Sequence, residues 1–285
     1  MDGHSKVLIT GADGFTGVHL RYELANFGYD CFALKANLLD QESVLAEVEE
    51  INPDYVVHLA AISFTAESEV EKIYNVNVLG SINLLTALSK LKVPPKKLLM
   101  ASTAAVYGMS EEELQSEEIV PAPVSNYACS KLCMEHMAQN YAHMFPIIIL
   151  RPFNYTGVGH GKHFLIPKII SAYKNGKNQI ELGNLDVYRE FNDVRDVCAI
   201  YRIIMDSSSS TSPINICTGQ SISLLRIIEL MDSMSGLKMS VKVNPLFVRD
   251  NEIKNLSGDP RKLQAITGYT ETFTIEDTLK WMYSH

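Results

Sequence analysis

The sequence contains no apolar segment long enough to cross a bilayer, and its first residues, MDGHSKVLIT, lack the apolar stretch of a secretory signal. It also lacks cysteines at the spacing of a disulfide scaffold or a metal site. The five cysteines include no C-x-x-C and no accompanying pair of histidines; they are Cys31, Cys129, Cys133, Cys198 and Cys217. We therefore expect no membrane span, no disulfide framework and no bound metal, and a cytoplasmic location, where thiols stay reduced.

Blocks of lysine or arginine are absent as well. The 25 basic and 33 acidic residues give a formal net charge of −8. A general nucleic-acid binder, or a protein that binds anionic membranes, is expected to carry a basic surface. The sequence therefore predicts no nucleic-acid partner and no membrane partner.

Internal repeats are also missing, and the short serine-rich segment at 207–212 indicates only a flexible connection. Hydrophobic residues make up 46% of the 285 positions and charged residues 20%, which is typical of a folded globular protein. This length suits about two domains, or one large α/β domain with a smaller appendage.

Short apolar segments alternate with longer helical patterns over the first 150 residues. The apolar segments lack the polar alternation of an exposed sheet, which indicates strands covered on both faces by helices. We therefore expect an α/β fold of the Rossmann type, with a doubly wound parallel sheet. The predicted strands are Lys6–Thr10, Asp30–Leu34, Tyr55–Leu59, Lys97–Ala101 and Pro146–Leu150, and the predicted helices are Gly14–Phe27, Gln41–Ile51, Ala66–Leu91 and Ser125–Phe145.

Beyond about residue 150 this alternation weakens. The segment 151–164 is rich in glycine and is expected to be a loop. We expect residues 1–154 to form the first domain, residues 155–285 to form mainly a smaller C-terminal α/β lobe, and a strand near 213–217 to return to the main sheet. The other elements expected here are helices at Leu165–Tyr173, Leu224–Met234 and Ile275–Tyr283, and a strand at 240–244.

The segment GADGFTG follows the first predicted strand directly and opens a helix, with glycines at 11, 14 and 17. Glycines there permit a tight turn, close approach of the backbone to a pyrophosphate, and close packing of strand and helix. The helix N-terminus then offers free N–H groups to the anion. The spacing departs from G-x-G-x-x-G, but its position between strand and helix predicts a dinucleotide site rather than an ordinary turn.

The choice between NAD and NADP depends on the end of the second strand, where an acid typically binds the ribose 2′-hydroxyl of NAD. No acid occurs from residue 31 to residue 39, since Asp30 stands at the strand entrance and Asp40 suits the cap of the next helix. Lys35 ends the strand and is suited to a 2′-phosphate, although it equally fits a solvated charge. NADP(H) is therefore favoured as the cofactor, with NAD(H) as the alternative.

Tyr127 and Lys131 stand four residues apart in YACSK, on a predicted helix. Residues at this spacing share one helix face, so the phenol and the ammonium reach the same ligand. The ammonium is expected to lower the pKa of Tyr127 and to help it exchange a proton with a substrate oxygen. A second match at 173–177 is interrupted by Asn175-Gly176. The alternative for Tyr127 is a core or dimer helix on which the lysine is incidental.

Thr103 follows the fourth predicted strand at its carboxyl end, the edge at which open α/β sheets bind ligands. A hydroxyl there is able to bind a reacting alcohol or carbonyl oxygen. Taken alone, Thr103 fits a simple strand-end cap equally well.

Six segments occur in a characteristic order and spacing: GADGFTG, HLAA (58–61), NVLGSINLL (77–85), STAAVYG (102–108), YACSK (127–131) and RPFNYTG (151–157). Together they resemble the extended short-chain dehydrogenase/reductase family (NAD-dependent epimerases and dehydratases), which acts on nucleotide sugars. The segments 183–197, 215–219 and 244–249 most resemble GDP-4-keto-6-deoxy-D-mannose reductases and GDP-mannose dehydratases. The resemblance implies that the smaller lobe binds a nucleotide sugar.

The resemblance also implies catalytic and cofactor-binding residues. Tyr127 is implied as the proton donor, Lys131 as the ligand of the nicotinamide ribose that tunes Tyr127, and Thr103 as the residue that orients the sugar oxygen. The implied cofactor-binding residues are Gly11, Gly14, Phe15, Gly17, Leu59, Ala60, Ala61 and Lys131, and Lys35 is added to them from its place at the strand end.

For the substrate, the resemblance implies contacts from Thr103, Asn154, Arg189 and Arg249. The two arginines would lie near the nucleotide diphosphate, since a guanidinium binds phosphate oxygens in pairs. Each arginine alone also fits an ordinary surface charge. Asn37 stands where relatives often carry an aspartate near the adenine, so the adenine contacts stay open.

The residues after Thr103 depart from the family's 4,6-dehydratases, which carry an acid one or two places on. Here Ala104 and Ala105 follow, and methyl groups cannot transfer protons. The expected function is therefore an NAD(P)H-dependent reductase of a nucleotide-diphosphate-4-keto-6-deoxy sugar. The resemblance favours a GDP-linked sugar, with a dTDP-linked sugar as the alternative. The alternatives are a 4-epimerase that retains NAD and, more distantly, a noncatalytic dinucleotide-binding regulator.

The predicted helices at 66–91 and 125–145 also bear on assembly. The second carries an apolar stripe that includes Cys133, Met134, Met137 and Tyr141. In relatives these helices form a two-fold contact, so a homodimer is expected. The alternative is that the whole stripe faces the core.

Overall fold

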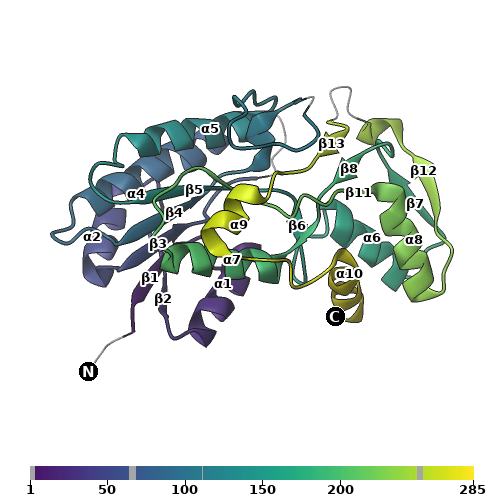
Figure 1. Cartoon of the computed structure of the whole chain (residues 1–285), viewed down its shortest axis with the longest axis horizontal. Helices are drawn as coiled ribbons and strands as arrows, with labels where there is room; N and C mark the ends of the chain where they lie inside the picture. The colour runs from purple at the N-terminus through teal and green to yellow at the C-terminus, as the bar shows by residue number, and fades with distance from the viewer. Residues whose placement is uncertain (1–3, 64–68, 111, 249–252) are drawn as a thin grey trace.

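A six-stranded sheet forms the centre of the larger part of the molecule (Figure 1). The computed structural model describes residues 4–63, 69–110, 112–248 and 253–285. The strands of the sheet are β1 (Lys6–Thr10), β2 (Asp30–Ala33), β3 (Tyr55–His58), β4 (Lys97–Ala101), β5 (Ile147–Pro152) and β10 (Ile214–Ile216). Their order is β10-β5-β4-β3-β1-β2, and all neighbours are parallel. The order reverses between β1 and β3, whose carboxyl ends therefore border the ligand crevice of such a sheet.

Helices cover both faces of this sheet, as the apolar strands predict. One face is covered by α2 (Gln41–Ile51), α4 (Gly80–Ser89) and α5 (Asn126–Gln139), and the other by α1 (Phe15–Asn26) and α7 (Val194–Asp206). Successive strand residues point to opposite faces, so Leu8 and Leu98 enter one core while Val7 and Leu99 enter the other. The predicted doubly wound α/β fold is confirmed.

Two long helices differ from their predicted form. The segment expected as one helix at 66–91 is divided into α3 (Val70–Tyr74), the π-helical η2 (Asn75–Leu79) and α4, and its first residues lie outside the described part of the chain. Apolar periodicity alone does not reveal a π turn. The helix expected at 125–145 ends at Gln139, after which i→i−3 hydrogen bonds form tight turns up to Pro146. Pro146 restricts only Phe145 directly before it, so the earlier end at Gln139 is not encoded by this proline.

The helix α7 is absent from the sequence-based expectations, although it packs along α1 and belongs with the main sheet. The expected loop at 151–164 also contains β6 (Tyr155–Thr156), which pairs with β9 (Asn192–Asp193) just before α7. Strand β10 lies parallel beside β5. After entering the smaller lobe, the chain therefore returns twice to the part that holds the six-stranded sheet, first in α7 and then in β10.

The smaller lobe lies at the right of Figure 1 and has its own apolar core. Its helices are α6 (Leu165–Lys174), α8 (Leu224–Ser235) and α10 (Ile275–Ser284). Its strands are β7 (Gln179–Leu182) paired with β12 (Ser240–Val243), and β8 (Tyr188–Arg189) between β11 (Ile222–Ser223) and β13 (Asn255–Leu256). The remaining short elements are η3 (Ala104–Tyr107), η4 (Pro245–Phe247) and α9 (Arg261–Thr267). Among the helices of the described residues, none combines the length and the apolar character that a membrane span needs.

The buried carboxylate of Glu190 holds together the segments after β8, β10 and β13, where the larger part and the smaller lobe meet. Glu190, directly after β8, accepts backbone N–H groups from Thr218 at 2.9 Å, Gly219 at 3.1 Å and Gly258 at 2.6 Å. Ser257 adds its hydroxyl at 3.0 Å. Burial raises the pKa of Glu190 in spite of these donors. Glu190 therefore fixes β8 against the loop after β10 and the loop after β13.

The apolar core under the sheet gives a direct stability prediction. Replacing Leu99 by alanine removes a fully buried side chain from β4 and is expected to lower the free energy of unfolding by about 2–5 kcal/mol. Leu246→Ala, at a position 89% exposed in η4, is the matched control and should change it by less than about 0.5 kcal/mol. Urea unfolding of both variants checks this, and equal losses would contradict the assigned core.

Candidate active site

The turn between β1 and α1 forms a cradle that only small residues fit. Gly11 has a φ of +69°, and a Cβ there would lie 2.9 Å from the backbone nitrogen of Ala60. A Cβ at Gly17 would lie 2.3 Å from the carbonyl oxygen of Gly11. Gly14 precedes α1 and offers no side-chain cap, so the N–H groups of the first turn face outward for an anion. This arrangement fits a pyrophosphate.

Beside Gly11 a pocket of about 200 Å³ opens at the carboxyl ends of β1, β2 and β3. Its lining is mostly apolar, and it consists of Thr10, Gly11, Leu34, Ala36, Asn37, Leu38, Ala60 and Val76. An apolar slot with one amide at its rim suits a purine ring and its ribose. The cradle and the pocket together fit an adenine dinucleotide.

A fully buried histidine supports this edge of the sheet. Nδ1 of His58 lies 2.6 Å from Oγ1 of Thr10, which also accepts the N–H of Ala60 at 3.1 Å. Nε2 lies 2.8 Å from Oγ of Ser81, whose hydroxyl donates to the carbonyl oxygen of Asn77. Burial lowers the pKa of His58 to about 3, so the ring is neutral. These partners assign the proton to Nε2, and the loop after β3 is held beside Gly11.

The same polar chain continues to α5 through the π-helical segment η2. Oδ1 of Asn77 accepts the N–H of Ile62 at 2.8 Å, and its Nδ2 donates to the carbonyl of Ile62 and, at 3.0 Å, to Oγ of Ser130. Ser130 in turn donates to the carbonyl oxygen of Tyr127 at 2.7 Å. The π turn places Asn77 inside the fold, where it ties the cofactor-side loop to the first turn of α5.

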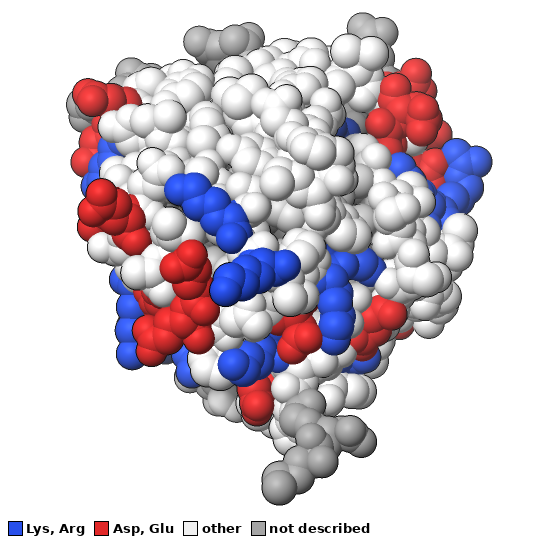
Figure 2. Space-filling view, turned by 90° about the vertical axis from the view of Figure 1, so that its left-hand side faces the viewer, with Lys and Arg blue, Asp and Glu red and all other residues white. Residues whose placement is uncertain are grey.

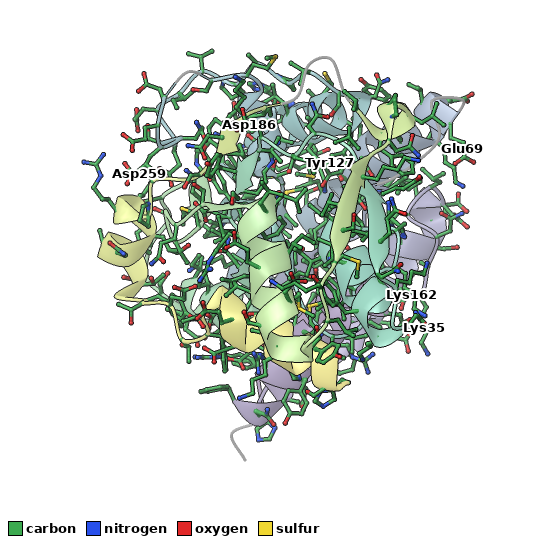
Figure 3. The ribbon with its side chains drawn as sticks, turned by 90° about the vertical axis from the view of Figure 1, so that its right-hand side faces the viewer. Lys35, Glu69, Tyr127, Lys162, Asp186 and Asp259 are labelled. Carbon is green, nitrogen blue, oxygen red and sulfur yellow. The ribbon has the colours of Figure 1, made fainter. Side chains whose placement is uncertain are left out.

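Thr103 and Tyr127 meet at the end of β4. Thr103 caps η3 and accepts the N–H of Ala105 at 3.2 Å. Tyr127 stands in the first turn of α5, whose cap is Ser125, and its side chain is partly exposed (labelled in Figure 3). Burial raises the pKa of Tyr127, while a hydrogen bond with the Thr103 side chain acts in the opposite direction. The pair therefore presents a protonated phenol beside a hydroxyl.

Lys131 lies one helical turn beyond Tyr127 and is only 2% exposed. Its Nζ donates to the carbonyl oxygen of Ala101 at 2.7 Å. Burial lowers the pKa of Lys131 to about 8, against the raising effect of Glu135. The sequence predicts a pKa of Tyr127 lowered by Lys131, whereas burial of the phenol raises it.

A buried ion pair lies beneath these residues, and the sequence motifs did not indicate it. Arg151 donates to Glu135 through Nε at 3.0 Å and through Nη2 at 2.6 Å. Ser102 donates to the same carboxylate, and Arg151 also donates to the hydroxyl of Tyr107 at 3.2 Å. That hydroxyl donates to Asn215 of β10 at 2.6 Å. The pair thus fixes α5, β5 and β10 around the segment that carries Thr103.

An aromatic contact joins the cradle to the entrance of the smaller lobe. The hydroxyl of Tyr155 in β6 lies 2.7 Å from Oγ1 of Thr16 in α1. The ring of Phe15, predicted as a cofactor contact, stacks on His160 with centroids 4.4 Å apart and on Tyr155 at 6.0 Å. Proximity to Tyr155 also raises the pKa of Tyr127. The contact between Thr16 and Tyr155 could not be predicted from the sequence, because the two residues stand 139 positions apart in the chain.

The remaining predicted residues are placed less centrally. Lys35 is exposed after β2 and reaches the edge of the molecule in Figure 3. Asn154 is exposed between β5 and β6, and its carbonyl accepts the N–H of Asn192 at 2.9 Å. Arg189 in β8 donates to the carbonyl oxygens of Tyr188 at 2.8 Å and Lys254 at 3.3 Å. Arg249 lies outside the described residues.

A larger cavity, of about 320 Å³, lies elsewhere, between α7, α9 and the loop that follows α9. Asp196 and Glu271 are among its lining residues, whereas Thr103, Tyr127 and Lys131 are not. The chemistry-bearing side chains gather instead at the carboxyl edge of β4, beside the dinucleotide cradle. A phenol, a hydroxyl and an ammonium at this edge are able to deliver a proton to an oxygen and to stabilise its charge.

Known proteins resemble the chain along nearly its whole length. A model of the family described as GDP-mannose 4,6 dehydratase matches residues 31–282. The chain is 38% identical to GDP-6-deoxy-D-talose 4-dehydrogenase of Aggregatibacter actinomycetemcomitans, over 98% of this chain and 97% of that protein. It is 30% identical to GDP-6-deoxy-D-mannose reductase of Pseudomonas aeruginosa, over 98% and 96%. The solved structure of RMD from Pseudomonas aeruginosa complexed with NADPH has a TM-score of 0.89 at 28% identity, over 99% of this chain and 98% of that one.

The buried ammonium predicts a pH-dependent stability. Lys131 has a pKa of about 8 in the folded chain against 10.5 when exposed, so between these values the folded chain has released a proton that the unfolded chain keeps. Stability should therefore rise with pH in this interval, by about 2–3 kcal/mol relative to Lys131→Met. Urea unfolding of both chains at about pH 7.5 and about pH 10 measures the difference. A parallel response of the two chains would contradict the lowered pKa.

Proposed function

The chain belongs to the family described as GDP-mannose 4,6 dehydratase, within the extended short-chain dehydrogenase/reductases, and from this premise we propose that it reduces the 4-keto group of a nucleotide-diphosphate-4-keto-6-deoxy sugar. The observation that carries the proposal is the meeting of Thr103, Tyr127 and Lys131 beside the glycine cradle. The GDP-linked sugar is favoured because both relatives named above are described as enzymes of GDP-linked 6-deoxy sugars.

The side chains suit the reductive direction. When bound, a nicotinamide dinucleotide supplies the hydride for the keto carbon. Tyr127 donates its phenolic proton to the oxygen that becomes an alkoxide, and its raised pKa keeps that proton in place before reaction. Thr103 shares the same oxygen. Lys131 holds the nicotinamide ribose, and its charge stabilises the phenolate that remains.

Dehydration is a poor fit to this site. Ala104 and Ala105 follow Thr103 in η3, and Ala104 is buried, so these positions offer no carboxylate to move protons on the sugar. Reaction at a single carbon remains. For the nucleotide diphosphate, Asn154, Arg189 and Arg249 stay the predicted contacts. The preference for NADP(H) that the sequence suggests rests on Lys35 alone.

We also propose a homodimer through α4 and α5. Helix α4 contains no charged residue, and the two charged residues of α5 other than histidine, Lys131 and Glu135, are both buried. In Figure 2 a broad upper area, at the height of these helices, carries neither Lys and Arg nor Asp and Glu. Leu79, just before α4, is 51% exposed. Met134 of the predicted stripe is fully buried, so only part of that stripe is available to a second copy.

Removing the phenolic hydroxyl tests the assignment of Tyr127. Tyr127→Phe is expected to lower kcat by about 10²–10⁴-fold, because the proton donor is lost, while the dinucleotide still binds. Tyr22→Phe, on the exposed side of α1 at 72% exposure, is the control and should leave kcat unchanged. Steady-state kinetics and dinucleotide titration give both quantities. Near-full activity of Tyr127→Phe would remove Tyr127 from the mechanism.

The reaction itself is tested with sugar nucleotides. GDP- and dTDP-4-keto-6-deoxy sugars are offered separately with NADPH or NADH, and the loss of nicotinamide absorbance is followed. We expect sugar-dependent oxidation of the reduced dinucleotide, fastest with the GDP-linked sugar. Turnover of a nucleotide sugar on retained NAD, without added reduced dinucleotide, would indicate a 4-epimerase instead. Oxidation of the reduced dinucleotide in the absence of any sugar would support neither the reductase nor the 4-epimerase.

The proposed dimer predicts a change of mass on substitution. Leu79→Glu is expected to convert a dimer into a monomer, because a charge would be buried without a partner at the contact. Val18→Glu, on α1 at a similar exposure of 53%, should leave the dimer intact. Sedimentation equilibrium of the two variants and the parent distinguishes them. A monomeric parent would overturn the proposed assembly.

A further inference from the structure

The dinucleotide pocket has an acidic neighbour that comes from a helix rather than from a strand end. Glu47, in the second turn of α2, accepts the backbone N–H of Lys35 at 2.9 Å and that of Ala36 at 2.7 Å. Its second contact to the Lys35 N–H measures 3.2 Å. Glu47 is half-buried. Its carboxylate is therefore held in one place, directly after β2.

In folds of this kind, the end of the second strand is the place that distinguishes NAD(H) from NADP(H). Ala36 both donates to Glu47 and lines the pocket of about 200 Å³, together with Gly11, Asn37 and Leu38. In sheets of this kind the adenosine ribose lies at the end of the second strand, where an acid binds the 2′-hydroxyl. Residues 31–39 supply no acid. Glu47 brings a carboxylate to the same strand end from the following helix.

The carboxylate also occupies the groups that a 2′-phosphate would use. Two consecutive backbone N–H groups form an anion-binding pair, and here both already donate to Glu47. A phosphate placed beside Ala36 would meet a fixed negative charge and would lack these donors. The ammonium of Lys35 does not balance this, since its side chain is exposed at the edge of the molecule, where solvent screens it (Figure 3).

We propose that Glu47 is the specificity-determining residue for the cofactor, and that it selects NAD(H) over NADP(H). The proposal rests on the nicotinamide dinucleotide of the proposed function and opposes the preference drawn from Lys35 in the sequence. A purely structural role of Glu47, as a cap for two N–H groups, would affect both dinucleotides alike. The measurable signature is therefore the ratio of their affinities.

The test is direct binding of NADH and NADPH to the full chain, without sugar, by titration calorimetry. The parent is expected to bind NADH at least about tenfold more tightly than NADPH, and Glu47→Gln to bind NADPH about tenfold more tightly than the parent while NADH changes less than about threefold. In this variant the glutamine side chain keeps the shape of Glu47 but carries no charge. Glu49→Gln, an exposed position on the same helix, is the matched control and should change neither affinity.

Each outcome separates the two proposals. A parent that binds NADPH as tightly as NADH overturns the role of Glu47, even if Glu47→Gln fails to fold. So does a folded Glu47→Gln, or the second variant Glu47→Ala, whose affinity ratio equals that of the parent. In both cases the proposed function stands. A parent that binds neither dinucleotide overturns the proposed function, and the role of Glu47 with it.

Discussion

The hydrogen bond from Lys131 to the carbonyl oxygen of Ala101 is the contact on which the site depends. It is one of three that successive turns of α5 make with the end of β4. Tyr127 bonds to Thr103, Lys131 to Ala101, and Glu135 to Ser102. Side chains four residues apart lie on one helix face, so a single helix orientation satisfies all three contacts. The reacting groups are thereby positioned by a strand end and a helix, which are more rigid than loops.

The buried pair of Glu135 and Arg151 contributes position more than stability. Removing two charges from water costs free energy that their attraction offsets only in good geometry, so such a pair is weak evidence for a stable fold. Here the carboxylate also accepts from Ser102, and the guanidinium donates to Tyr107. An apolar pair of equal volume would fill the space without orienting either neighbour. These hydrogen bonds hold the side chains of α5 that face the site in a fixed position relative to β5 and β10.

Features that a few neighbouring residues encode could be predicted from the sequence, whereas features that depend on long-range contacts could not. The glycine turn, the strand-end Thr103 and the pair Tyr127 and Lys131 are each encoded within a few residues of sequence. The position of Glu47 is not encoded near the strand end, because only the packing of α2 brings this carboxylate to Ala36. The lowered pKa of Lys131 likewise depends on burial, which spacing does not report. The π turn at 75–79 keeps helical periodicity, so the sequence predicts an unbroken helix there.

The π turn also restricts the length of its segment. A π-helical turn accommodates about one residue more than an α-helical turn. Deleting one residue between 75 and 79 would restore regular helical winding and swing the side chain of Asn77 by about 100° around the axis. Asn77 would then leave both Ile62 and Ser130, which it now bridges. The length of this short segment is thus constrained as strictly as the identity of its asparagine.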